Sequence, residues 1–272
     1  MQENRLYNRG DQQRLIDEAL SSEPIKNTFR LGWEFITLNR KFTLTAVVIF
    51  ILLNILGMIP FIALIFMVLS AVFGVALQIH MGRVLYVSKD IKEYIEEIHD
   101  STLEAILNRY TATAFGAYMG WILMLMLVVI LISLVGGTTG LINQNMSEAD
   151  LLNLLLLLGF PFIIVALLFS YVHPLVESNI IMAEGFTAGL KAVFSIFSIE
   201  LWRLSFQKSY FKYISIFGVI MLVILFTGAF LIGLFTSLTG LAMLGNILLM
   251  LLMYFFMVMM SIGAMMARGI VE

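Results

Sequence analysis

The chain has no cysteine and little charge for its 272 residues. Without cysteine it can form no disulfide, thiolate nucleophile, iron–sulfur cluster or cysteine-based zinc site. Charged residues make up 12% of the sequence, against about 25% in typical soluble domains, and hydrophobic residues make up 61%. The basic residues form no dense run, so the electrostatic footprint of a nucleic-acid-binding protein is missing. We therefore expect a membrane protein whose main partner is the lipid bilayer, with no nucleic acid.

Sequence signatures of enzymes and cofactors are missing as well. The chain has no phosphate-binding loop, no Gly-x-Ser-x-Gly, no His-Glu-x-x-His and no Gly-x-Gly-x-x-Gly. No Asp, Glu, Lys or Arg lies at the centre of a long apolar run, which argues against a pump built on buried carboxylates. His80, His99 and His173 are far apart and lack a second histidine at i+3 or i+4, so no metal site is predicted. We expect a protein that is not an enzyme and needs no cofactor.

Six apolar windows have the length of a membrane span, which takes about 20 residues. The predicted spans are 42–57, 61–84, 115–135, 151–172, 213–235 and 241–266. The fold class is therefore an all-α membrane protein of about six transmembrane helices in three hairpins. In the first hairpin Gly57 ends a helix and Pro60 starts the next, and Ser147 is the expected N-cap of the fourth span. Because the first window is short, a re-entrant pair of helices is the alternative there.

The 16 basic residues indicate how the spans are oriented. Seven precede the first span, four lie between the second and third, four between the fourth and fifth, and one follows the sixth. The three predicted hairpin turns contain none. An even number of spans places all sixteen on one face, and the positive-inside rule makes that face cytoplasmic. Both ends of the chain are then expected in the cytoplasm.

Three segments on the predicted cytoplasmic side carry apolar residues at helical spacing. The stripes are Ile25, Phe29, Trp33 and Ile36; Ile91, Ile95, Ile98, Ile106 and Tyr110; and Phe186, Leu190, Phe194, Phe197, Leu201 and Leu204. Each stripe suits an amphipathic helix at the membrane surface or one docked under the bundle. The chain then consists of three units, each a surface helix followed by a hairpin, which begin near Pro24, Asp90 and Glu177.

The third unit carries a family resemblance. Pro174 and Glu177 are followed by Glu184, Ala188 and Lys191, and then by Trp202-Arg203 and a pair of spans. This arrangement resembles the pattern "Pro, acidic residue, then Glu-x-x-x-Ala-Leu-Lys-x-Ser" of bacterial six-span membrane proteins of unknown function. Those proteins are similar to the membrane domain attached to some glycerophosphodiester phosphodiesterases. The resemblance covers about the last 100 residues and implies a bacterial inner-membrane protein, and it brings no catalytic residue to this chain.

Four residues near the predicted cytoplasmic ends of the spans are the candidate functional residues. Glu177, Glu184 and Lys191 follow one another at heptad spacing, so one continuous helix would place all three on one face. His173 lies at the end of the fourth span. A salt-bridge network is the favoured interpretation of this face, and a gate or a docking patch for a partner is the alternative.

The last span is rich in methionine, and Met250, Met253, Met257 and Met260 recur at helical spacing. Three thioethers on one face could hold Cu(I). Flexible packing against lipid and neighbouring helices is the favoured interpretation.

The sequence favours a non-catalytic scaffold, assembly or regulatory component of the bacterial inner membrane. Residues 1–41 would form a cytoplasmic tail and residues 42–272 a single transmembrane domain, with a protein partner on the cytoplasmic face. A small-solute transporter or channel subunit is the first alternative, and a membrane-embedded lipid-modifying enzyme is the second. No residue pattern indicates an oligomeric state.

Overall fold

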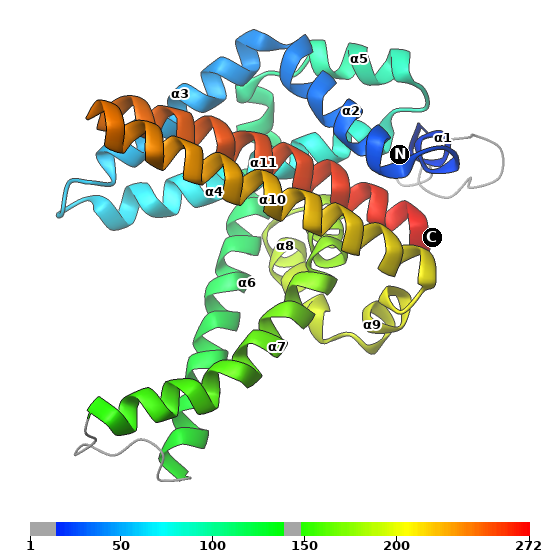
Figure 1. The fold of residues 1–272 in the computed structure, drawn as a ribbon. Coiled ribbons are helices and arrows are strands. Elements are labelled where there is room, and N and C mark those ends of the chain that lie inside the picture. Colours follow the sequence, from blue (N-terminus) through cyan, green and yellow to red (C-terminus); the bar gives the residue numbers. More distant parts are fainter. Residues whose placement is uncertain (1–14, 139–147) are drawn as a thin grey trace.

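The computed structural model describes the backbone of residues 15–138 and 148–272, and the side chains of residues 15–131, 133–134 and 163–272. Every regular element in these ranges is a helix (Figure 1). The shorter helices are α1 (Leu15–Ser21), α2 (Pro24–Leu38), α5 (Ile91–His99), α8 (Phe186–Phe194), the 3-10 helix η1 (Ser195–Phe197) and α9 (Ile199–Ser205). The longer helices are α3 (Arg40–Leu56), α4 (Ala63–Val87), α6 (Leu103–Thr138), α7 (Glu148–Met182), α10 (Lys208–Thr239) and α11 (Ala242–Val271).

Five of the longer helices, α4, α6, α7, α10 and α11, are long and apolar enough to cross a membrane. The sixth candidate is the pair α2 and α3, which passes the same test jointly but is bent by 87° at Asn39. Helices of this length and composition are those of a multi-pass membrane protein. The predicted all-α membrane fold is confirmed at this level.

The observed helices extend beyond the predicted spans. α6 begins twelve residues before its predicted start and α7 ends ten residues after its predicted end, because polar residues continue the helix outside the apolar window. Pro60 does not start a helix, since α4 begins at Ala63 and Pro60 lies in the preceding turn. Gly240 ends α10 in the left-handed conformation with φ of 68°. The predicted N-cap Ser147 lies outside the described residues.

The packed core lies at one end of the bundle. α11 buries most of its residues from Val258 to Ala267, whereas its residues from Ala242 to Leu244 are exposed. α7 likewise buries Val172 to Ser178 almost completely but exposes most side chains from Ile163 to Ser170. In Figure 1, α3, α4, α10 and α11 run alongside one another, whereas α6 and α7 lead away from them. The α6–α7 pair therefore separates from the other long helices toward its own tip.

This packed end also carries the charge, and we call it the basic end. Every described Lys and Arg lies in α1, α2, α5, α8 or α9, in their connections, or in the adjoining turns of the long helices. The opposite tips of the described helices expose large apolar side chains, among them Phe61, Leu64, Leu238 and Met243. Positive charge and apolar surface are thus separated along the helices, which is the pattern that a bilayer favours.

The helix α2 docks on the bundle by a face that only partly matches the predicted stripe. Pro24 occupies its first turn, and the N-cap residue is Glu23. The residues that pack inward are Asn27, Thr28, Leu31, Gly32 and Phe35, whereas Trp33 of the predicted stripe is 58% exposed. The small Gly32 allows this docking, since a Cβ at that position would meet the Met259 sulfur of α11 at 2.6 Å. Ile25, Phe29 and Ile36 of the predicted stripe are partly buried and pack against the core, so the docked face of α2 includes them and leaves out only Trp33.

The helix α5 begins as predicted at Asp90, whose side chain accepts a hydrogen bond from the Glu93 amide. The largest side chain that it buries is Tyr94, which the predicted stripe did not include. The Tyr94 hydroxyl donates to the Leu31 carbonyl of α2 at 3.0 Å. Burial raises the pKa of Tyr94 well above its usual value, so this hydroxyl remains a donor.

The third surface segment is not one helix. It is divided into α8, η1 and α9, so a single stripe from Phe186 to Leu204 cannot form, and Phe186 and Phe197 are exposed. α8 packs closely on α6, and each of the two helices has a glycine at the contact. A Cβ added to Gly116 would overlap the Phe186 carbonyl oxygen, and one added to Gly189 would overlap the Thr113 carbonyl oxygen. This backbone contact determines the position of the segment that follows, which forms one wall of the site described next.

Candidate functional site

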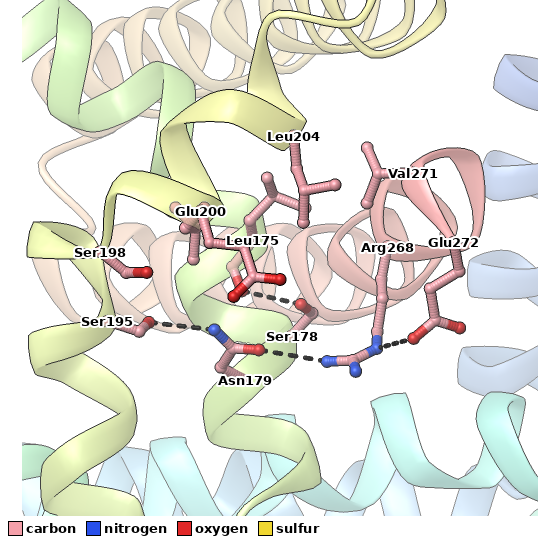
Figure 2. Close-up of a pocket in the computed structure, with 11 residues that line it drawn as sticks. Leu175, Ser178, Asn179, Ser195, Ser198, Glu200, Leu204, Arg268, Val271 and Glu272 are labelled. Atoms are coloured by element: carbon pink, nitrogen blue, oxygen red, sulfur yellow. Dashed lines mark hydrogen bonds and ion pairs between the residues drawn. The ribbon is translucent and has the colours of Figure 1, made fainter.

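A pocket of about 250 Å³ lies at the basic end between α7, the η1–α9 segment and α11 (Figure 2). On α7 the spacing of Leu175, Ser178 and Asn179 places all three on the face that lines the pocket. Its complete lining is Leu175, Ser178, Asn179, Ser195, Ser198, Glu200, Leu201, Leu204, Arg268, Val271 and Glu272. We call this the Arg268 pocket.

Asn179 joins the three walls of the Arg268 pocket. Its amide nitrogen donates to the Ser195 hydroxyl at 3.0 Å, and its amide oxygen accepts from Nη1 of Arg268 at 3.2 Å. Nε of Arg268 donates to Oε1 of Glu272 at 2.7 Å, and Figure 2 shows these three bonds in one row. Because the guanidinium is held from two sides, it presents its remaining Nη2 donors in a fixed orientation.

Two polar groups of the Arg268 pocket are without a hydrogen-bond partner in the described part of the chain. They are the Ser198 hydroxyl and the Glu200 carboxylate, both on the segment that leads from η1 into α9. A second pocket of about 180 Å³ shares Arg268 and Glu272 with the first and is otherwise lined by Ile16, Asp17, Tyr86, Met265 and Gly269. Arg268 therefore borders two cavities at the same end of α11.

The predicted residues His173 and Glu177 lie together one turn apart on α7. His173 Nδ1 is 3.6 Å from Glu177 Oε2, and the His173 ring stacks on Trp121 of α6 with ring centroids 5.6 Å apart. The Glu177 side chain is only 6% exposed, and neither of its oxygens has a hydrogen-bond partner among the described residues. Neither residue lines the Arg268 pocket. A carboxyl group buried in this way is unfavourable for stability, because desolvation is not offset by hydrogen bonds.

Glu184 and Lys191 do not share a helix face with Glu177, so that prediction was wrong. α7 ends at Met182 and α8 starts at Phe186, and Gly185 between them has φ of 82°, a left-handed conformation that interrupts the heptad spacing. Glu184 instead pairs with Arg83 of α4 at 3.2 Å, and Lys191 is exposed on α8. The structure thus brings together two of the four predicted residues.

The partner of Glu184, Arg83, was not among the predicted site residues, although it makes three side-chain hydrogen bonds at this end. Arg83 Nε donates to the Ile181 carbonyl at 2.8 Å, and Nη2 donates to the Ala183 carbonyl at 2.7 Å. The Arg83 side chain is 12% exposed and also lies over the Tyr110 ring at 5.4 Å. It satisfies carbonyls at the end of α7, which have no partner within the helix.

Sequence reasoning also missed the Arg268 pocket. Asn179, Ser195 and Arg268 belong to three separate elements, and no local spacing connects them. One signal was available, since Arg268 is the single basic residue after the last span. An isolated cation at a helix end in a short polar segment indicates either an interfacial anchor or a specific partner.

The methionines of the last span line a cavity of about 530 Å³ between α3, α4 and α11. Met250, Met253 and Met257 contribute to its wall, together with Met67 and the amides Asn54 and Gln78. The Asn54 amide nitrogen donates to the Phe50 carbonyl of its own helix at 2.9 Å and approaches the Met250 sulfur at 3.5 Å. These contacts are of the packing kind that was the favoured interpretation.

The remaining histidine at the basic end is part of the packing. His80 Nε2 and the Ser101 hydroxyl are 2.7 Å apart, and the His80 ring lies among those of Phe35, Phe42 and Tyr110. Within the described residues, no three His, Asp or Glu side chains gather closely enough to hold a metal ion.

Comparisons with known proteins leave the function to be argued from this geometry. No family model matches the chain, and no curated protein and no solved structure matches it.

Proposed function

We propose that the chain is a non-catalytic scaffold, assembly or regulatory component of the bacterial inner membrane. Its long helices would cross the bilayer as three hairpins, with both ends of the chain and the basic end in the cytoplasm. The observation that supports this proposal best is the separation of positive charge from apolar surface along the helices. The core and the ionic contacts lie at one end, and the remaining length of the spans is mostly exposed and apolar.

Lateral exposure of the spans favours a scaffold over a transporter. Only 11% of the most apolar window of α10 is buried, and the other long helices reach at most 39%. A transporter encloses its substrate path between helices, near the middle of the membrane. Here the large cavity between the spans is lined mainly by Met, Phe and other apolar side chains, with the amides Asn54 and Gln78 near its ends. A laterally open set of apolar helices is suited to contact lipid or the spans of another protein.

The short helices would lie at the membrane surface in this arrangement. Trp33 of α2 is 58% exposed, Ile199 at the start of α9 is 86% exposed, and Phe206 directly after α9 is 76% exposed. Large apolar side chains near cations such as Arg30 and Arg203 are typical of helices at the headgroup level. The faces of these helices that carry Glu, Asp and Lys would then be available to a cytoplasmic partner.

The absence of cysteine provides a direct test, because any single cysteine introduced is the only thiol in the chain. We would introduce Ser70→Cys and Gly74→Cys in the cavity between the spans, and Ser198→Cys in the Arg268 pocket as the water-accessible control. A charged, membrane-impermeant methanethiosulfonate reagent applied to both faces should modify only the control. Modification of Ser70→Cys or Gly74→Cys would reveal an aqueous path and favour transport.

The orientation is tested separately with a reporter fused after Gly240, at the turn between α10 and α11. The proposal predicts periplasmic activity of alkaline phosphatase and no cytosolic fluorescence at this position. A reporter that is active in the cytosol would refute the proposed arrangement of the spans. The same reporter fused after Glu272 should give the opposite result.

A further inference from the structure

The Arg268 pocket carries opposite charges on different walls, and its lining indicates which ligand it can hold. The cation is Arg268 of α11, and the carboxylates are Glu200 of α9 and Glu272, which accepts a hydrogen bond from Arg268. With one cation and two carboxylates, the pocket disfavours a ligand of net negative charge. A ligand that engages both Arg268 and Glu200 must carry an anionic group and a cationic group of its own.

The donors on one side of the pocket suit a phosphate. Arg268 keeps its Nη2 donors after binding Asn179 and Glu272, and the Ser195 and Ser198 hydroxyls line the same cavity. Guanidinium and hydroxyl donors of this kind are the usual protein partners of phosphate oxygens.

The carboxylate on the other side suits a primary amine. Glu200 has no partner among the described residues, and an ammonium group has three donors to offer a carboxylate. No aromatic side chain lines the pocket, whereas quaternary ammonium groups are recognised by aromatic cages. The lining therefore favours an ethanolamine-like group over a choline-like one.

The depth of the pocket agrees with a lipid source for these groups. Arg268 lies two residues beyond the predicted end of the sixth span and Ser178 six beyond that of the fourth, which is about 3 to 9 Å along a helix. The headgroup layer on each side of the hydrocarbon is about 5 to 8 Å thick. The exposed Ile199 at the start of α9 and Phe206 directly after it are suited to the same layer.

The size and the apolar part of the lining agree as well. The volume of about 250 Å³ is smaller than the about 300 to 1,000 Å³ of pockets that enclose drug-sized ligands, so a headgroup fits and a whole lipid does not. Leu175, Leu201 and Leu204 form an apolar wall beside the polar groups. Such a wall suits the glycerol end of a lipid whose chains remain in the bilayer.

We infer that the Arg268 pocket binds the zwitterionic headgroup of an aminophospholipid, with the phosphate at Arg268 and the ammonium at Glu200. This inference goes beyond the proposed scaffold role, since a transporter or an enzyme could hold a lipid in the same way. It would make the basic end sensitive to the lipid composition of the membrane.

The test measures lipid binding to the purified full chain in detergent by native mass spectrometry. The probes are short-chain phosphatidylethanolamine, phosphatidylglycerol and phosphatidylcholine, together with glycerophosphoethanolamine, which carries the headgroup without acyl chains. We expect phosphatidylethanolamine to bind most tightly. Glu200→Gln should remove its preference over phosphatidylglycerol, and Arg268→Gln should weaken both by about tenfold, the equivalent of one charge-assisted hydrogen bond.

Matched controls separate the pocket from the general charge of the surface. Arg203→Gln removes an exposed cation of α9 that does not line the pocket, and Glu96→Gln removes an exposed carboxylate of α5. Both should keep the lipid preference of the unmodified chain. Equal binding of the three lipids, or unchanged selectivity in Glu200→Gln, would overturn the proposal. If glycerophosphoethanolamine binds as tightly as phosphatidylethanolamine, the inference that the headgroup belongs to a lipid would be wrong.

Discussion

Replacing Arg83 by alanine should destabilise the basic end more than the loss of an exposed ion pair would. Its guanidinium donates to the carbonyls of Ile181 and Ala183 at 2.8 and 2.7 Å and to Glu184 at 3.2 Å, while the side chain is 12% exposed. A hydrogen bond from a charged donor contributes about 1.5 to 3 kcal/mol, and contributions within one network are not additive. We expect Arg83→Ala to lower the free energy of unfolding by about 3 to 5 kcal/mol.

The contribution of the carbonyls can be separated from that of the ion pair. The Glu184 side chain is 81% exposed, so Glu184→Gln should cost no more than about 1 kcal/mol. Arg83→Lys keeps the charge, but the lysine ammonium lacks the planar fork with which the guanidinium reaches two carbonyls and a carboxylate. This variant should therefore recover only part of the lost stability.

The measurement is equilibrium unfolding of the full chain in mixed micelles with increasing dodecyl sulfate, followed by fluorescence of its three tryptophans. A loss below about 1 kcal/mol for Arg83→Ala would refute the view that Arg83 holds the end of α7. A Glu184→Gln variant as unstable as Arg83→Ala would show instead that the ion pair carries the interaction.

Two further predictions use the same unfolding measurement. Gly116→Ala and Gly189→Ala should each lower the unfolding free energy by about 1 to 3 kcal/mol, because a Cβ would overlap a carbonyl oxygen across the α6–α8 contact. The control Gly218→Ala, with open space around it, should have no such effect. Equal effects at all three sites would contradict the close contact. Glu177→Met should raise the unfolding free energy by about 1 to 3 kcal/mol, because it removes a buried carboxyl group without hydrogen bonds. A destabilised variant would mean that Glu177 has a stabilising partner.

Much of the fold could be predicted from the sequence because the relevant physics is local. A window of about 20 apolar residues is unstable in water and stable in lipid, whatever lies beside it. The helices α4, α6, α7, α10 and α11 therefore appear where the windows predicted them, although polar residues extend their ends. The Asp90 N-cap of α5 and Pro24 in the first turn of α2 are local signals of the same kind.

The docking faces of the surface helices could not be predicted in this way. A stripe of apolar residues identifies a side of a helix that avoids water, and both a protein core and a lipid interface satisfy that condition. In α2 the docked side contains Gly32, because close contact with α11 requires a small residue. It also contains Asn27 and Thr28, because their polar groups bond to the Ala19 carbonyl of α1 and the Tyr213 hydroxyl of α10. Hydrophobic periodicity alone assigned Trp33 to the same role.

For the candidate site, too, part could be predicted from the sequence and part could not. Its region was predictable, because the sequence places its basic residues only near one end of the spans, where they avoid the cost of entering hydrocarbon. Its residues were not, apart from the pair His173 and Glu177, whose contact follows from one turn of helix. Arg83 and Ile181 are 98 residues apart, and Arg268 and Asn179 are 89 apart. Those contacts depend on how α4, α7 and α11 cross, which only the packing of the whole chain decides.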